Sequence, residues 1–202
     1  MEKMKFTSPK GSPLWTIVTG KGKETEKGSN KFKYQTVIKV HQDDAVAEMK
    51  IIDDFWAENK PKGAKARPKT KAYKMEEDKE TGEETGYVLF GFSTPTTYGT
   101  SGDQKKIKVF TAKAPIREVA LGDKQIGEGS IARAMGVLAT YEYNGSYGTT
   151  LYLDAISLSK FAAYEGGGAT AEDVVEDEEA EDIDLGETVV GTESVETEET
   201  RV

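Results

Sequence analysis

The 202-residue sequence contains no cysteine and only one histidine, His41. The absence of cysteine excludes disulfides, thiolate metal sites and cysteine nucleophiles. A single imidazole excludes any catalytic or metal site that needs a second histidine. No glycine-rich segment lies between a strand pattern and a helix pattern, so neither a Walker loop nor a dinucleotide-binding fingerprint is present. We therefore expect a protein that is not an enzyme and that holds no cofactor and no metal.

Long apolar runs are also missing. No stretch approaches the roughly 18 apolar residues that a membrane-spanning helix requires. The amino-terminal residues Met1–Lys5 lead into no apolar segment of the kind found in secretion signals. We expect no membrane association and a chain that stays in the compartment where it is made.

Aromatic residues are absent from residues 166–202, which begin with three glycines and then become strongly acidic. Such a segment cannot bury enough apolar surface to offset the entropy lost on ordering, and its like charges repel one another. We predict a disordered acidic tail at 166–202. The remaining residues, 1–165, are enough for one folded domain with a substantial core.

The acidic tail changes the meaning of the net charge of −9. It holds 14 of the 36 acidic residues and one of the 27 basic residues, which leaves residues 1–165 with 22 acidic and 26 basic residues. A mildly basic body joined to an acidic tail suggests an anion-binding body with a competitor on the same chain. A flexible tail of this length reaches roughly 35 Å, more than the radius of gyration of such a domain, about 15 Å. A tail that only improves solubility is the alternative.

Alternation of apolar and polar residues predicts a mainly β domain. The clearest case is residues 32–40, where every second residue from Phe32 to Val40 is apolar or β-branched and most of the others are polar. Strands are predicted at 14–18, 32–40, 87–94, 104–110, 131–143 and 149–161. Near Ala155 the apolar set changes phase, which predicts a β-bulge.

One helix pattern interrupts the strands. Asp43 or Asp44 is a suitable N-cap, and apolar residues at helical spacing continue to about Asn59, two residues before Pro61. Trp56 lies on this apolar stripe, so we expect it in the core. Several strands with one helix between them predict a small barrel or sandwich with an inserted α-helix.

Cations and aromatic residues occur together at several places on these elements. On the exposed face predicted for 104–110, two lysines and a phenylalanine alternate; amines can meet the phosphates of a single-stranded nucleic acid, and rings can stack on its bases. The segment from Lys60 to Lys74 is the most basic in the chain and includes an aromatic residue. Solvated lysines and core packing of the strand aromatics are the alternatives. The candidate DNA contacts are Lys106, Lys108 and Phe110, then Arg133, Tyr141, Tyr143 and Tyr152, and Lys69, Lys71 and Tyr73 from the basic segment.

Four stretches occur in an order that resembles a known family. They are FTSPKG at 6–11, the run from Tyr73 to Phe92 that ends in TGYVLFGF, IGEGS at 126–130 and LYLDAISL at 151–158. The set resembles the bacteriophage single-stranded DNA-binding proteins related to the T7-type helix-destabilising protein, and it spans most of residues 5–161.

The resemblance implies an OB-fold, a five-stranded barrel with a helix packed across it. It implies sequence-independent binding of single-stranded DNA in phage DNA replication, recombination and repair, in the cytoplasm of the infected bacterial host. It also implies that the acidic tail competes with DNA for the groove and recruits replication and recombination proteins.

Two features depart from the family. The T7-type tail ends in an aromatic residue, whereas this chain ends Glu199-Thr200-Arg201-Val202, which puts a partner contact through a terminal ring in doubt. The basic segment from Lys60 to Lys74 receives no role from the family. The oligomeric state is open, with a homodimer as one option.

Other classes of function remain as alternatives. An acidic-tailed protein-interaction or chaperone-like module without nucleic-acid binding is the main one. A nucleic-acid enzyme fits less well because there is a single histidine. A DNA-mimicking inhibitor fits less well because the acidic residues are concentrated in the tail.

Overall fold

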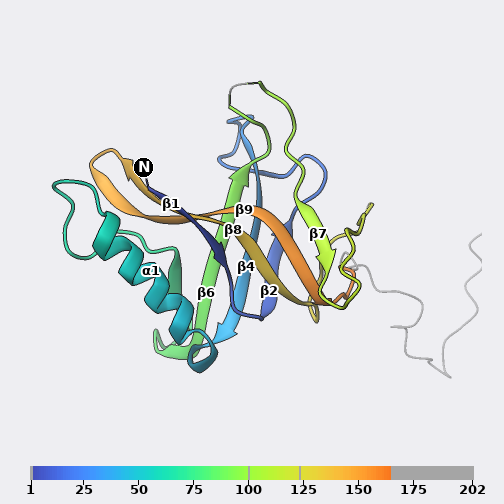
Figure 1. The fold of residues 1–202 in the computed structure, drawn as a ribbon, viewed down its shortest axis with the longest axis horizontal. Helices are drawn as coiled ribbons and strands as arrows, with labels where there is room; N and C mark the ends of the chain where they lie inside the picture. Colours follow the sequence, from blue (N-terminus) through green and yellow to red (C-terminus); the bar gives the residue numbers. More distant parts are fainter. Residues whose placement is uncertain (1, 100, 123, 165–202) are drawn as a thin grey trace, which may run out of the picture. The chain divides into compact units, whose positions relative to one another are not determined.

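One curled sheet of nine strands and one α-helix make up the described part of the chain (Figure 1). The structure is a computed structural model that describes residues 2–99, 101–122 and 124–164. The predicted mainly β domain with an inserted helix is confirmed, but the sheet has nine strands, whereas the resemblance implied a barrel of five. The elements are β1 (Lys3–Thr7), β2 (Ser12–Ile17), β3 (Lys23–Glu24), β4 (Phe32–His41), the 3₁₀ turn η1 (Gln42–Asp44), α1 (Val46–Asn59), β5 (Tyr73–Glu77), β6 (Glu84–Pro95), β7 (Lys108–Thr111), β8 (Ile131–Tyr143) and β9 (Ser146–Lys160).

The main path of the sheet runs β1-β8-β9-β6-β4-β2. Its pairs are antiparallel, except that β9 runs parallel to β6. β1 and β2 stand at opposite ends of this path, although only four residues separate them in the chain. That short link stays bonded to β8, because the Ser8 N–H donates to the Ala134 carbonyl (2.9 Å) and the Gly11 N–H to the Ala132 carbonyl (3.0 Å). The link therefore holds the two ends of the curled sheet together.

The additional strands are short pieces beside this path. β3 pairs with β4, β5 with β6, and β7 runs parallel to β9. The sequence patterns did not predict β3, which has two residues, or β5, which ends in two glutamates. They also did not predict β1, whose last two residues were expected to begin an extended lead-in. The strand predicted at 104–110 begins later than expected, at Lys108.

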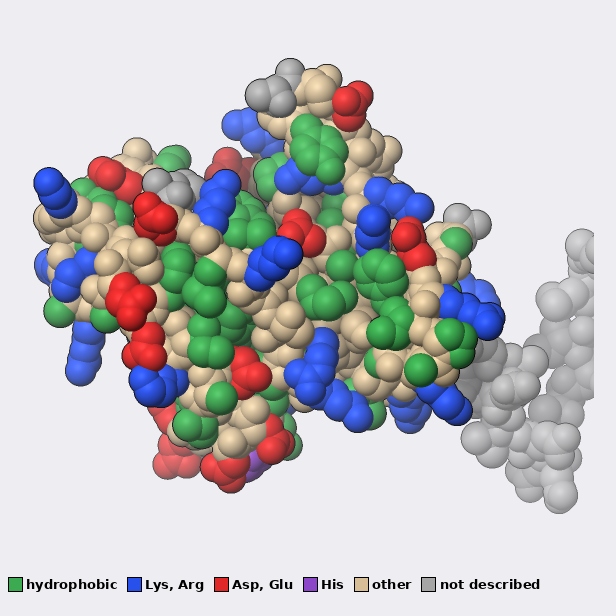
Figure 2. All heavy atoms as spheres, viewed as in Figure 1, with side chains coloured by type: hydrophobic (Ala, Val, Ile, Leu, Met, Phe, Trp, Pro, Cys, Tyr) green, Lys and Arg blue, Asp and Glu red, His purple; other side chains and the backbone are tan. Residues whose placement is uncertain are grey.

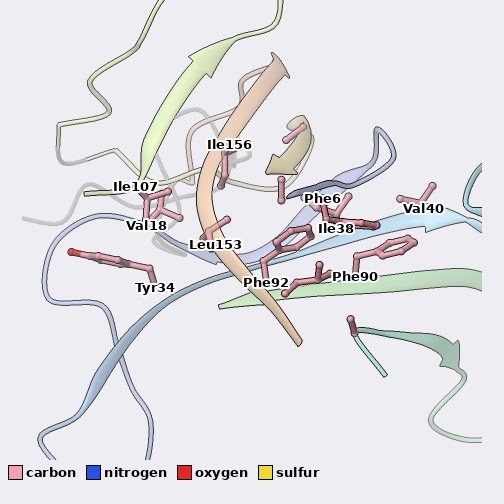
Figure 3. Packing of buried hydrophobic residues seen from close by; sticks show 14 of the residues in the cluster. Phe6, Val18, Tyr34, Ile38, Val40, Phe90, Phe92, Ile107, Leu153 and Ile156 are labelled. Atoms are coloured by element: carbon pink, nitrogen blue, oxygen red, sulfur yellow. The ribbon is translucent and has the colours of Figure 1, made fainter. Parts of the chain in front are cut away.

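The core fills the inside of the curl. In β4, every second residue from Tyr34 to Val40 is buried, as the alternation predicted. Phe90 and Phe92 of β6 lie beside Ile38 and Phe6 in the same cluster (Figure 3). The ring of Phe6 is 6.3 Å from that of Phe90 and 6.2 Å from that of Phe92. Full burial of each such side chain stabilises the fold by about 1.5–3 kcal/mol.

The predicted bulge interrupts the pairing of β8 with β9. Met135 pairs with Ala155, whereas the next residue, Gly136, pairs with Leu153, so Asp154 has no partner in the ladder. The extra residue keeps apolar side chains on the core side both before and after the bulge. Because a bulge bends its strand and increases its twist, it also helps the sheet to curl.

The helix α1 lies beside the sheet, between β4 and β5 in the chain (Figure 1). Trp56 is 3% exposed, so its predicted place in the core is confirmed. The prediction of an aspartate N-cap was wrong: Asp43 and Asp44 lie in η1, whose N-cap is His41, and Ala45 precedes α1 without a side-chain cap. Capping rules favour carboxylates, but here Nδ1 of the imidazole accepts from the Asp43 N–H at 3.4 Å. Within the described ranges, no helix has the length and apolar character needed to cross a membrane.

Candidate nucleic-acid interface

A groove of about 890 Å³ lies on the solvent side of the sheet. Most of the lining residues of β4, β6 and β9 alternate with core residues. Residues of β2, β8, the start of β5 and the chain before β5 complete the lining. We name it the main groove. It is lined by Trp15, Val37, Leu89, Gly91, Tyr141, Glu142, Tyr143, Thr149, Thr150, Tyr152 and residues 69–74.

Six of the ten residues that the sequence marked as candidate DNA contacts line the main groove. Two strand pairs explain why the tyrosines come together: Tyr141 of β8 is opposite Gly148 of β9, and Tyr152 of β9 is opposite Val137 of β8, so both point to the same face. Tyr143, at the end of β8, is 71% exposed. The six residues are Lys69, Lys71, Tyr73, Tyr141, Tyr143 and Tyr152.

The basic segment is anchored at its carboxyl end to the β8–β9 hairpin. The Lys69 N–H donates to the Tyr147 carbonyl (2.9 Å), and the Thr149 N–H donates to the Thr70 carbonyl (3.0 Å). The close approach requires glycine at 148, because a Cβ there would lie 2.5 Å from the Thr70 carbonyl oxygen.

The same segment is held on its other side by α1. The indole N–H of Trp56 donates to the Ala66 carbonyl at 2.9 Å. A buried aromatic of the helix thus fixes the course of a chain segment that has no regular structure of its own. The consequence is that Lys69 and Lys71 are presented to the main groove from an anchored segment.

Lys71 and Tyr73 form a cluster with Asp53 of α1. The Lys71 amine lies 2.8 Å from a carboxylate oxygen of Asp53 and 2.9 Å from the Tyr73 hydroxyl, which itself donates to Asp53 at 2.9 Å. Partial burial lowers the pKa of Lys71, but the hydrogen bonds to Asp53 and Tyr73 outweigh it and raise that pKa. Burial, followed by the bond to Asp53, raises the pKa of Tyr73. Lys71 is therefore charged at neutral pH. It forms an ion pair with the Asp53 carboxylate, and it could bind a phosphate through the same amine.

Gly91 leaves part of the main groove open. It pairs regularly with Val37 of β4, and no atom lies within 4 Å of the place that a Cβ would occupy. A glycine inside a strand often marks a bulge or the close approach of another chain or a ligand. The pairing is regular, and the open space allows a ligand to approach the backbone.

Trp15 and Lys74 line the groove but were not among the candidate contacts, and Trp15 is the aromatic residue that sequence reasoning missed. It is 66% exposed, whereas the other tryptophan of the chain is buried. Its φ of +47° is unusual for a residue other than glycine, and it lies where the register of β2 against β4 shifts between Leu14 and Ile17. This irregularity turns the ring outward in a strand that the sequence predicted to be regular. A tryptophan between Leu14 and Thr16 in so short a strand gave no signal of this.

The other four candidate contacts do not line the main groove. Lys106 precedes β7 and forms an ion pair with Glu118 at 3.2 Å. Arg133 donates to the Ser8 carbonyl at 3.0 Å. Lys108 and Phe110 lie in β7.

Three of these four residues nevertheless share a face of the sheet. Phe110 of β7 pairs with Ser157 of β9, which pairs with Arg133 of β8, and Lys108 lies two residues before Phe110. Arg133 and Tyr141 are eight positions apart in β8, a separation of about 26 Å along a strand. The candidate contacts therefore fall into two groups on one sheet.

Acidic side chains are unevenly placed. On the face shown in Figure 2 many of them lie over α1 and the turns below it and single ones lie elsewhere, whereas lysine and arginine side chains are spread over the whole face. Glu142 is the one acidic residue that lines the main groove within the described ranges. Residues 2–99, 101–122 and 124–164 contain no group of three or more His, Cys, Asp or Glu side chains placed to hold a metal ion.

Comparison with known proteins identifies the fold. No family model and no curated protein matches the sequence. Among solved structures, gp2.5, a single-stranded DNA-binding protein encoded by bacteriophage T7, matches with a TM-score of 0.57 at 16% identity, over 86% of this chain and 98% of its own. The C-terminally truncated single-stranded DNA-binding protein of bacteriophage Enc34 matches with a TM-score of 0.58 at 13% identity, over 78% of this chain and 86% of its own. The Enc34 protein in complex with single-stranded DNA matches with a TM-score of 0.57, also at 13% identity, over 78% and 87%. This chain therefore has the fold of bacteriophage single-stranded DNA-binding proteins, as the resemblance in its sequence indicated.

Proposed function

We propose that this chain binds single-stranded DNA, without sequence preference, through the main groove. The observation that carries the proposal is the lining of the groove, which combines three lysines with five aromatic residues beside an open glycine. Cations that meet phosphates and rings that stack on bases are the two components of sequence-tolerant single-strand binding. The lysines are Lys69, Lys71 and Lys74, and the aromatic residues are Trp15, Tyr73, Tyr141, Tyr143 and Tyr152.

We infer that the sheet contains an OB-fold. If β1 and β2 are counted as one bent strand, the main path becomes a ring of five strands, completed by β4, β6, β9 and β8. In an OB-fold the face of the second and third strands and the loop between the fourth and fifth bind oligonucleotides. These elements correspond to β4, β6 and the β8–β9 turn; residues of β4 and β6 line the main groove, and so does Tyr143, the last residue before the turn.

Lys106, Lys108, Phe110 and Arg133 remain proposed contacts for DNA that extends beyond the main groove. Arg133 and Phe110 lie on the same face of the sheet as Tyr141 and Tyr152, farther along β8 and β9. A strand bound in the groove and continuing along these two strands of the sheet would meet them next.

The role of residues 166–202 is proposed from their composition, since they lie outside the described residues. Their 14 acidic residues compete with DNA phosphates for the lysines of the main groove. Being tethered, they act at an effective concentration on the order of millimolar. DNA long enough to add phosphate contacts and stacked bases displaces them, and they then recruit replication and recombination proteins. The folded domain at 1–165 does not need them to fold.

The biological setting follows from these proposals. The chain protects and presents single-stranded DNA during phage DNA replication, recombination and repair, in the cytoplasm of the infected bacterial host. It acts by binding, with no cofactor or metal and with no chemical step on the DNA. A homodimer would place two such grooves in one particle.

Fluorescence anisotropy with labelled oligo-dT, duplex DNA and single-stranded RNA, over a salt series, tests the proposal. Full-length protein should bind oligo-dT more tightly than duplex, and a 1–165 fragment with an unchanged circular dichroism spectrum should bind it more tightly still. The recovered oligonucleotide should be intact with and without Mg²⁺. No binding to oligo-dT by either protein would refute the proposal and favour the protein-interaction module.

A lysine triple variant tests the place of binding. Glutamine at all three groove lysines removes up to three phosphate contacts, which should reduce the slope of log K against log salt by about 2. A matched triple variant at exposed lysines outside the groove should leave the slope unchanged. Equal slopes for the two variants would refute the main groove as the site. The groove variant is K69Q/K71Q/K74Q and the control is K10Q/K27Q/K79Q.

A further inference from the structure

Trp15 separates the main groove from a second groove. The second groove has a volume of about 560 Å³ and lies between β2 and the segment 125–128. Trp15 lines both grooves. The second groove also exposes the side chain of Tyr164, which is 58% exposed. Two largely exposed aromatic residues therefore border one concave surface.

The conformation of Trp15 has an energetic cost. A non-glycine residue with φ of +47° in a strand is strained, and the exposed indole loses the burial that would stabilise it. Gln35 of the neighbouring strand supports this conformation, because its side-chain amide donates to the Trp15 carbonyl at 3.3 Å. Strained residues that persist in a fold concentrate at binding sites, where the ligand uses the strained geometry.

Tyr164 is held in place by the backbone. Its N–H donates to the Gln125 carbonyl at 2.8 Å, and the preceding residue, Ala163, bridges Ile126. The ring is thus presented at the second groove from an anchored chain segment. Lys23 of β3 also lines this groove, as does Glu128.

We propose that the second groove is an additional subsite for single-stranded nucleic acid, which the strand reaches by crossing Trp15 from the main groove. The proposal rests on the proposed function of the main groove. One base stacks on Trp15 where the strand crosses, and a following base stacks on Tyr164. Lys23 meets a phosphate, and the side-chain amide of Gln125 offers a donor and an acceptor to base edges.

The charge of the second groove indicates that DNA fills it after the main groove. It has one lysine and one glutamate, whereas the main groove has three lysines and one glutamate. Binding in the second groove therefore depends on stacking more than on phosphate attraction. Short oligonucleotides fill the main groove first, and only longer ones reach Tyr164.

A length series tests this order. Oligo-dT from about 4 to 16 nucleotides covers the range of site sizes of single OB-folds. In full-length protein, Tyr164→Leu and Lys23→Gln should leave the affinity for the shortest bound oligonucleotides unchanged. Tyr164→Leu should weaken binding of the longest by about fivefold or more, the equivalent of one stacked base. Lys27→Gln, four residues after Lys23 but outside both grooves, should have no effect at any length.

Intrinsic fluorescence gives a second readout. The chain has two tryptophans, and Trp56 is buried. Stacking on Trp15 should therefore quench the emission on DNA binding, and Trp15→Leu should remove that quenching. Unchanged affinities of Tyr164→Leu at every length would overturn the second groove, and quenching that survives Trp15→Leu would overturn the crossing point. Failure of the unaltered protein to bind any oligonucleotide would instead refute the proposed function of the main groove.

Discussion

Leucine in place of Gly91 should separate folding from binding. Gly91 lies in the middle of β6, paired with Val37, and its backbone is extended. A Cβ at this position has no atom within 4 Å, so the new side chain meets no steric obstacle in the protein. It would project into the main groove, where we propose that DNA lies.

The two effects should have opposite signs. Loss of the backbone freedom of glycine in a strand should stabilise the fold by roughly 0.5–1 kcal/mol, the difference measured between Gly and Ala. A leucine side chain that excludes one stacked base should cost about 1–3 kcal/mol of binding free energy, which weakens binding of oligo-dT by roughly 5- to 150-fold. Urea unfolding would measure the first effect and anisotropy titration with oligo-dT the second.

Gly99 provides the matched control. It also has open space around its Cβ position, but it does not line the main groove. Gly99→Leu should bind oligo-dT as the unaltered protein does. If Gly91→Leu is folded and binds with unchanged affinity, the DNA does not pass over Gly91, and the reasoning from the open glycine is wrong.

Three further substitutions probe the surroundings of the groove. Asp53→Asn frees Lys71 from its carboxylate partner, so oligo-dT should bind up to about fivefold more tightly at low salt in anisotropy titrations, and the pKa of Lys71, measured by NMR, should fall. The hydrogen bond from Lys39 is the main cause that lowers the pKa of Glu76 below its ordinary 4.5. The charged Glu76 therefore stabilises the fold above pH 4.5, and this stabilisation is lost as the pH falls through the lowered pKa. Glu76→Gln should accordingly flatten the acid limb of a curve of unfolding free energy against pH. Gly148→Ala would press a methyl group against the anchored basic segment, which should destabilise the fold by about 1–3 kcal/mol in urea unfolding.

The parts of the fold that the sequence predicted are those set by local period. The alternation in 32–40 predicts which side of β4 is buried, because successive side chains in a strand point to opposite faces. The change of phase near Ala155 predicted the bulge for the same reason, and the helical stripe predicted the burial of Trp56. The closure of the sheet through the chain between β1 and β2 depends on hydrogen bonds to β8, more than 100 residues away, and has no local signature.

The division of the candidate contacts into two groups depends on the register between paired strands, which local sequence patterns do not reveal. Phe110 and Tyr152 both lie in sequence surroundings that suit stacking on bases. However, β7 pairs with β9 only from Ala155 onward, so the bulge of β9 lies between Phe110 and Tyr152. The basic segment shows the reverse case. Its composition shows that it is cationic but not where it lies in the fold. Its position is set by the hydrogen bond between Thr70 and the β8–β9 hairpin and by the hydrogen bond from Trp56 of α1. The sequence around a residue therefore indicates which kind of contact it can make. Whether it belongs to a given site depends on the strand pairing, which brings residues from distant segments beside it.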